Sequence, residues 1–257
     1  LDKEPSVMPV APDSWEPAAS ELSGKTLLIT GASEGIGRAI SLACAEAGAE
    51  VLLLGRNESR LESLYDTIMR TGAPTPGIIP IDLGSATYDD FVNLSSTIAQ
   101  SITRLDGLVH NASLLGDRKP IAQTNASGWH QLMQVNVNAT FMLTQTLLPL
   151  MELAPKASIV FTSSGVGRRG RAYWGGYAVS KFATEGLMEV LADELGATSN
   201  IRVNSLNPGA VNTAMRRAAY PAENPDTNPS PEALVNHWIY LMSDASEGVH
   251  GCALSAQ

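Results

Sequence analysis

A tyrosine and a lysine four positions apart, Tyr177 and Lys181, are the residues of this sequence best placed for proton chemistry. From Phe182 to about residue 195, apolar side chains recur at helical spacing, and a helix that begins near Gly176 puts both side chains on one face. An unperturbed tyrosine has a pKa of about 10, and an ammonium group one turn away lowers it by favouring the phenolate. The pair predicts a tyrosine tuned for acid or base catalysis, although a core tyrosine and a solvent-facing lysine give the same spacing.

A glycine-rich turn near the start of the chain has the sequence of a phosphate-binding site. Residues 25–30 predict a strand, residues 38–48 a helix and residues 50–54 a second strand, with TGASEGIG between the first strand and the helix. A dinucleotide-binding turn requires this arrangement, because the pyrophosphate binds at the start of the helix. Its glycines allow a tight turn, the approach of a phosphate, and close packing of the helix on the strand. The predicted binding residues of the turn are Gly31, Ser33, Glu34, Gly35, Ile36 and Gly37.

The end of the second strand indicates which dinucleotide is bound. An NAD-binding protein usually has an acidic residue there, which bonds to the ribose 2′-hydroxyl, but this strand runs into Gly55 and Arg56. A guanidinium suits a 2′-phosphate, since it donates two parallel charge-assisted hydrogen bonds. The Ser33 hydroxyl would add a donor, whereas the Glu34 carboxylate opposes a phosphate. We therefore expect NADP(H) rather than NAD(H), although Arg56 also suits the solvated start of a helix.

The rest of the chain continues to alternate between strand and helix. Further strands are predicted at residues 78–81, 105–110, 157–162, 201–206 and 251–255, and further helices at residues 87–103, 129–151, 176–195 and 231–243. Alternation of this kind predicts an α/β protein with a single doubly wound parallel sheet, Rossmann-like, of about seven strands and with helices on both faces. We expect one domain over residues 22–257, after an irregular arm over residues 1–21.

Composition and charge limit the possible partners. The chain has 257 residues, of which 44% are hydrophobic, enough for one large α/β domain. The formal net charge of −9 argues against nucleic acid as a partner, because phosphate binding needs a basic face. No apolar run approaches the length of a membrane span, and Cys44 and Cys252 form no metal-binding spacing. The N-terminal residues lack the basic start and apolar core of a signal peptide, so a cytoplasmic location is expected.

Taken together and in order, these motifs resemble those of the short-chain dehydrogenase/reductase family over about residues 22–255. TGASEGIG resembles the TGxxxGIG turn of the family, HNAS at residues 110–113 its NAG, VNV at residues 135–137 its VNL, and PGAVNT at residues 208–213 its PGxVxT. Ser164 precedes Tyr177 by 13 residues, the family spacing. Ser113 departs from the pattern, which has glycine there. Runs such as SKFATEG further resemble the YciK-type bacterial oxidoreductases.

The resemblance implies a role for each matching residue. Lys181 would lower the pKa of Tyr177 and bind the nicotinamide ribose, and Asn136 would hold a water molecule in a proton relay. Asn138 and Ser163 are the less suitable neighbours of Asn136 and Ser164. The implied catalytic residues are Asn136, Ser164, Tyr177 and Lys181. The implied cofactor contacts beyond the glycine turn and Arg56 are Asp82, Leu83, Asn111, Ala112, Tyr177, Lys181, Pro208, Gly209, Val211 and Thr213.

The implied activity is NADP(H)-dependent hydride transfer to or from a carbonyl or alcohol substrate, in a homodimer or homotetramer. Two alternatives stay open: a redox sensor that binds NADP(H) without turnover, and a ketoreductase acting on acyl thioesters. The second needs a basic patch to dock an acidic carrier, and its candidates are Arg168, Arg169 and Arg171. The same arginines suit an anionic substrate or an ordinary solvated loop, and residues 210–230 are expected to form a lid.

Overall fold

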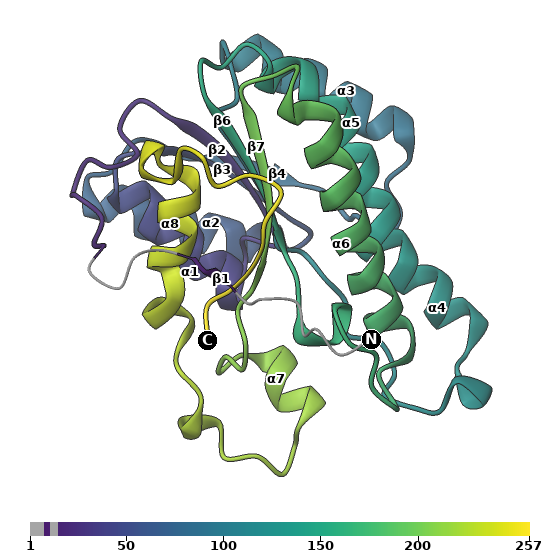
Figure 1. Ribbon diagram of the computed structural model, residues 1–257. Helices are drawn as coiled ribbons and strands as arrows, with labels where there is room; N and C mark the ends of the chain where they lie inside the picture. Colours follow the sequence, from purple (N-terminus) through teal and green to yellow (C-terminus); the bar gives the residue numbers. More distant parts are fainter. Residues whose placement is uncertain (1–7, 11–14) are drawn as a thin grey trace.

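One parallel sheet runs through the middle of the molecule in the computed structural model, which describes residues 8–10 and 15–257 (Figure 1). Its strand order is β1-β8-β7-β6-β5-β2-β3-β4, and every neighbouring pair is parallel. The strands are β1 (Met8–Pro9), β2 (Thr26–Thr30), β3 (Glu50–Gly55), β4 (Gly77–Pro80), β5 (Gly107–His110), β6 (Ala157–Thr162), β7 (Ile201–Asn207) and β8 (Ala253–Ser255). The predicted single, doubly wound parallel sheet is confirmed, and strands β2 to β8 are the seven that the sequence predicts.

The eighth strand lies in the segment that the sequence predicts to be an irregular arm. Met8 pairs with Leu254 and Pro9 with Ser255, at the free edge of β8. An edge strand offers unpaired backbone N–H and C=O groups to any extended segment. This pairing therefore depends on the backbone and is not predicted by a side-chain pattern. The arm residues 1–7 and 11–14 lie outside the described part of the chain.

Helices cover both faces of the sheet (Figure 1). They are α1 (Gly35–Glu46), α2 (Glu58–Thr71), α3 (Tyr88–Ser101), α4 (Ala126–Met133), α5 (Ala139–Met151), α6 (Gly175–Gly196), α7 (Ala214–Ala219) and α8 (Val235–Met242). Short 3₁₀ turns occur at Ile121–Gln123, Gly165–Gly167, Pro225–Thr227, Pro231–Leu234 and Asp244–Ser246. Buried side chains of α1, α2 and α8 form one core with the sheet, and those of α3, α5 and α6 form a second core on the opposite face.

The strands are apolar on both sides because both of their faces are covered. Leu27 and Ile29 of β2 point into the core of α1, α2 and α8, whereas Leu28 between them points into the core of α3, α5 and α6. All three side chains are fully buried. This is why the strands read as continuous apolar runs in the sequence rather than as alternating ones.

Several helix boundaries differ from the sequence-based expectation. Helix α2, which was not predicted, begins after Asn57, whose side chain accepts a hydrogen bond from the Arg60 N–H, and ends at Gly72 in the left-handed conformation. The predicted helix over 231–243 is a 3₁₀ turn, Pro231–Leu234, followed by α8. The predicted lid over residues 210–230 contains α7.

The strand order places the carboxyl ends of β2 and β5 at a topological switch point. The chain runs from β2 outward through β3 to β4, then returns to β5 on the other side of β2 and continues outward through β6, β7 and β8. Connections that diverge in this way leave a crevice outside the carboxyl ends of the two central strands, where open α/β sheets bind ligands. The predicted site residues follow these strand ends.

Within residues 8–10 and 15–257, no helix combines the length and the apolar character that crossing a bilayer requires.

Candidate active site

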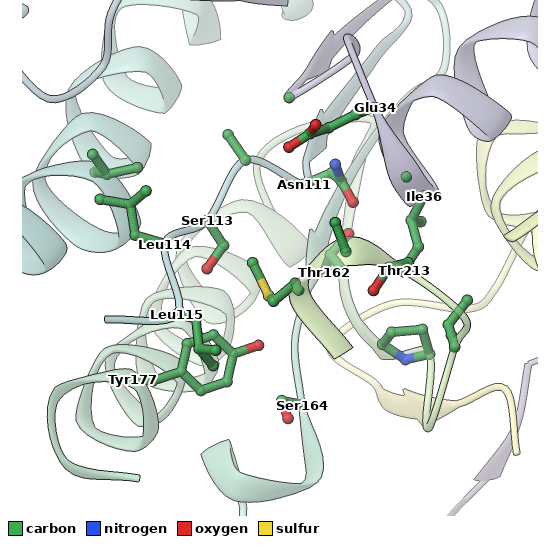
Figure 2. A pocket seen from close by; sticks show the side chains of 18 of the residues that line it. Glu34, Ile36, Asn111, Ser113, Leu114, Leu115, Thr162, Ser164, Tyr177 and Thr213 are labelled. Atoms are coloured by element: carbon green, nitrogen blue, oxygen red, sulfur yellow. The ribbon is translucent and has the colours of Figure 1, made fainter. Parts of the chain in front are cut away.

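A cavity of about 320 Å³ lies at the carboxyl ends of the central strands. Figure 2 shows Tyr177 and Ser164 in one part of it and Glu34, Ile36 and Asn111 in another, with Thr162 and Thr213 between them. All but two of the site residues predicted from the sequence line this cavity. Those that do are Gly31, Ser33, Glu34, Gly35, Ile36, Arg56, Asp82, Leu83, Asn111, Ala112, Ser164, Tyr177, Lys181, Pro208, Gly209, Val211 and Thr213. Gly37 and Asn136 are buried and do not line the cavity.

The glycine turn brings the start of helix α1 to the cavity. Gly31 and Gly35 have φ of +67° and +54°, which side chains rarely adopt. A Cβ atom on Gly37 would collide with the carbonyl oxygen of Gly31 and the side chain of Asn111, so this position requires glycine. Glu34, the residue before α1, makes no side-chain hydrogen bond to the helix, and the first turn of α1 has no acidic residue. Free N–H groups and the positive end of the helix dipole therefore suit a phosphate.

Thr30 joins the glycine turn to the loop after β5. Its hydroxyl donates to the Val109 carbonyl at 3.3 Å and accepts from the N–H groups of Asn111 and Ala112, each at 3.0 Å. The Asn111 side chain donates to the Thr30 carbonyl at 3.2 Å. These bonds hold the two loops that would enclose a dinucleotide at a fixed separation.

Asn136 lies in a π-helical turn, Gln134–Asn138, between α4 and α5, where the sequence predicts one continuous helix. The Asn136 amide brackets Leu114: its Oδ1 accepts from the Leu114 N–H at 2.7 Å, and its Nδ2 donates to the Leu114 carbonyl at 2.9 Å. The same Nδ2 donates to Ser180 Oγ in α6 at 3.0 Å. No direct bond to Lys181 occurs among the described residues, so the relay through Asn136 stays a prediction.

Tyr177 and Ser164 form the part of the cavity that can move a proton. Burial raises the pKa of the Tyr177 phenol to about 12, and its hydrogen bond with the Ser164 side chain opposes this shift. The sequence-based expectation of a lowered pKa assumed that Lys181 dominates. In the structure the Lys181 ammonium lies 5.6 Å from the centre of the tyrosine ring and donates to the Thr162 carbonyl at 2.7 Å. Burial is therefore the main cause of the shift, and it favours the protonated phenol.

Lys181 is itself buried, and a carboxylate lies near it. Burial lowers the pKa of the Lys181 ammonium to about 8, while the charge of Glu185, one turn further along α6, raises it. Tyr177, Lys181 and Glu185 thus follow one another at four-residue intervals on one buried stripe of the helix. Glu185 was not predicted from the sequence, although its position four residues after Lys181 indicates that the two side chains share one helix face.

Glu185 is held by a buried network that includes Arg168. The Arg168 Nε donates to Glu185 at 3.0 Å, and its other nitrogens donate to Ser255 Oγ at 3.0 Å and to the Leu254 carbonyl at 2.7 Å in β8. Ser163 Oγ donates to the same carboxylate at 2.6 Å. Both charged side chains are at least 86% buried. The proposal that Arg168 faces an anionic substrate or carrier is therefore wrong, because its charge is paired inside the protein.

Two arginines lie near the glycine turn, one of them in the wall of the cavity. Arg56 lines it, is exposed, and makes no hydrogen bond or ion pair within the described ranges. Arg60, which sequence reasoning missed, pairs with Glu34 on the glycine turn. The ion pair with Arg60 partly neutralises the Glu34 carboxylate, which by itself would repel a 2′-phosphate. Its signal was the position of Arg60 in the first turn of α2, four residues after Arg56 in the sequence.

Two buried hydroxyls in the cavity lack partners. Ser113 Oγ and Thr162 Oγ1 have no hydrogen-bond partner among the described residues. Buried hydroxyls are normally bonded, so both suit polar groups of a bound ligand. Ser113 replaces the glycine expected from the family pattern, but its φ is not positive, so the side chain causes no backbone strain. The uncapped start of α1 and these two hydroxyls together fit a dinucleotide.

The remaining predicted contacts are held in place by local bonds. Asp82 Oδ1 accepts from the Gly84 N–H at 2.9 Å, which fixes the turn after β4. Thr213 Oγ1 accepts from the Arg216 N–H at 3.1 Å and thereby caps α7. The C-terminal Gln257 donates to the Pro208 carbonyl at 2.8 Å. The cavity wall after β7 is thus attached to the end of the chain.

The parallel sheet, its switch point and the glycine turn at an uncapped helix define a Rossmann-type α/β protein. Comparison with known sequences identifies the family: the model of the short chain dehydrogenases matches residues 25–224. The chain belongs to the short-chain dehydrogenase/reductase family and is an oxidoreductase of that family.

Similar proteins come from several bacteria. The chain is 46% identical to the oxidoreductase YciK of Escherichia coli over 243 residues, which covers 95% of this chain and 96% of that protein. A short chain dehydrogenase structure from Pseudomonas syringae is 50% identical, with a TM-score of 0.93 over 95% of this chain and 99% of that one. A short chain dehydrogenase from Escherichia coli, complexed with NADPH, is 47% identical, with a TM-score of 0.91 over 94% of this chain and 100% of that one.

Proposed function

We propose that the protein is an NADP(H)-dependent oxidoreductase that transfers a hydride between nicotinamide and a carbonyl or alcohol substrate. The observation that carries this proposal is that Tyr177, Ser164 and Lys181 line the same cavity as the uncapped start of α1. The nicotinamide supplies the hydride when bound, and the protein supplies binding, orientation and proton transfer.

Ser164, Tyr177 and Lys181 have different roles in the proposed proton transfer. The Ser164 hydroxyl donates a hydrogen bond to the substrate oxygen and stabilises its developing charge. Tyr177 donates the proton, and a phenol whose pKa is about 12 is fully protonated at neutral pH. In the opposite direction, the oxidation of an alcohol, the phenolate of Tyr177 would accept the proton. The Lys181 ammonium holds the Thr162 carbonyl and places positive charge beside the ring.

Arg56 is expected to determine the choice of cofactor, and the NADPH bound to the similar Escherichia coli protein supports this choice. Arg56→Ala is expected to weaken NADPH binding by about 1.5–3 kcal/mol, or roughly ten- to hundredfold, because a charge-assisted hydrogen bond is lost. NADH lacks the 2′-phosphate, so its affinity is expected to change little. Fluorescence titration of both nucleotides measures the ratio. Arg70→Ala, at the far end of α2, is the control; an unchanged ratio in Arg56→Ala would remove Arg56 from this role.

A screen of aldehydes and ketones that follows NADPH absorbance tests the activity. A redox sensor would bind NADPH without turnover of any compound, whereas a ketoreductase specific for acyl thioesters would reduce only carrier-linked or coenzyme A-linked substrates. The two alternatives are therefore separated from a general carbonyl reductase in one experiment.

Assembly is proposed to involve the outer faces of α5 and α6. Four large apolar side chains are 43–58% exposed there: Phe141, Val179, Phe182 and Val190. An apolar surface of this kind marks an interface. Light scattering at micromolar concentration is expected to give a dimer or tetramer, and Phe182→Glu is expected to shift the mass toward the monomer. A wild-type monomer would contradict the proposal.

A further inference from the structure

Three guanidinium groups surround one tyrosine beside the cavity. The Arg118 and Arg216 guanidiniums lie over the Tyr220 ring, 4.8 and 3.9 Å from its centre. The Arg171 Nη1 donates to the Tyr220 hydroxyl at 3.2 Å. The Arg118 guanidinium also lies over the Trp174 ring, at 4.5 Å. These residues come from the loop after β5, the loop before α6, and α7, so three separate segments bring positive charge to one place.

The positive charges of this cluster exceed its negative charges. Glu223 accepts two hydrogen bonds from Arg216, both of 2.6 Å. Neither Arg118 nor Arg171 has an acidic partner within 4.0 Å among the described residues. The buried Nε of Arg118 also has no hydrogen-bond partner there. In a chain whose net charge is −9, two arginines without an acidic partner beside one tyrosine are unusual, and like charges that lie close together repel each other. An additional anion would remove that repulsion.

The cluster adjoins the proposed catalytic residues. Trp174 and Arg216 both line the cavity that Tyr177 lines, and the Trp174 ring lies 5.7 Å from the Tyr177 ring. Apolar side chains of Leu115 and Met215 line the same part of the cavity. A substrate whose carbonyl reaches Tyr177 therefore has an apolar wall beside it and guanidinium groups further out.

We propose that Arg118, together with Arg171 and Arg216, binds an anionic oxygen group on the substrate, a carboxylate or a phosphate, remote from the carbonyl that is reduced. A guanidinium donates two parallel hydrogen bonds to either group. The Trp174 and Tyr220 rings, inclined at 51° to each other, both contact the Arg118 guanidinium and limit its movement. Glu223 shows that the cluster accommodates a carboxylate in this two-bonded geometry. This inference rests on the proposed carbonyl reductase activity and adds the class of its substrate.

Matched aldehydes test the proposal. The probes are 4-carboxybenzaldehyde, 4-formylphenyl phosphate and the neutral methyl 4-formylbenzoate, each reduced with NADPH. The wild-type protein is expected to have a kcat/KM at least tenfold higher for one of the anionic probes than for the neutral ester. A higher value for the carboxylate or for the phosphate identifies which anion is bound. Equal values for all three would overturn the proposal and leave the reductase activity intact.

Variants of Arg118 test whether the preference for anionic aldehydes comes from this cluster. Arg118→Gln is expected to reduce the ratio of anionic to neutral kcat/KM to near one, and Arg118→Lys, which keeps the charge but not the planar fork, to an intermediate value. Arg70→Gln, at an exposed arginine near the end of α2, makes the same change in net charge and is expected to keep the wild-type ratio. A ratio that is unaffected in both Arg118 variants would overturn the assignment to this cluster.

If no aldehyde is reduced, that result contradicts the proposed reductase function and leaves the anion site to be tested by binding. Isothermal titration of the NADPH-loaded protein with the two dianions benzene-1,4-dicarboxylate and phenyl phosphate requires no turnover. At least one of them is expected to bind tenfold or more tightly to the wild type than to Arg118→Gln. Equal or undetectable binding of both to the two proteins would refute the anion site.

Discussion

Replacing Tyr177 with phenylalanine is expected to lower the turnover of a carbonyl substrate by about 10²- to 10⁴-fold, the usual contribution of a general acid. The substitution removes one oxygen and keeps the ring, which packs against Trp174 at 5.7 Å between ring centres. The fold and the affinity for NADPH are therefore expected to change little. Steady-state kinetics with NADPH, together with a nucleotide titration, separate the two effects.

A matched control comes from a neighbouring tyrosine. Tyr173 is 59% exposed and does not line the cavity, so Tyr173→Phe is expected to retain wild-type turnover. Ser164→Ala is expected to reduce the rate while NADPH binding is kept, because it removes only the hydrogen bond to the substrate oxygen. Near-normal turnover by Tyr177→Phe would refute the proposed mechanism even if NADPH binding were demonstrated.

The second large effect concerns stability. Arg168→Met is expected to lower the free energy of unfolding by about 3–5 kcal/mol, because it leaves the Glu185 carboxylate buried without its cation. The network joins α6 to β8 and to the end of β6, so the loss is expected to extend beyond one contact. Urea unfolding followed by circular dichroism measures it.

Two further variants make this prediction specific. Arg169→Met changes the adjacent, exposed arginine and is expected to shift the unfolding free energy by less than about 0.5 kcal/mol. The double variant Arg168→Met/Glu185→Met removes both charges and is expected to recover at least part of the loss, since an apolar pair can replace a buried ion pair. A single Arg168→Met variant as stable as the wild type would show that the pair contributes nothing.

Much of the fold and the cavity lining could be predicted from the sequence because both depend on local patterns. Strands covered on both faces read as apolar runs, and a glycine turn between a strand and a helix has few structural interpretations. The residues at strand ends were then brought together by topology alone, since parallel strands end at the same edge of the sheet. This explains why Gly31, Asn111 and Ser164 line one cavity although they are far apart in the sequence.

The parts that could not be predicted depend on contacts between distant segments. Whether Arg168 faces a ligand or Glu185 is decided by how the loop after β6 folds back on α6. The direction of the Tyr177 pKa shift depends on how deeply the phenol is buried, which helical spacing does not report. The π-helical turn around Asn136 and the guanidinium cluster at Tyr220 likewise arise from tertiary packing.

The most direct test of the account is to follow the hydride itself. The wild-type protein is incubated with NADPH deuterated at C4 of the nicotinamide, in each of the two stereochemical forms, and with a panel of aldehydes and ketones; the alcohols formed are analysed by mass spectrometry. The account predicts that one form of the cofactor transfers its deuterium, as deuteride, to the carbinol carbon of at least one product, with one NADP⁺ formed per alcohol. If NADPH binds but no carbonyl in the panel acquires the label, the protein binds the nucleotide without the proposed reaction, and the account is contradicted.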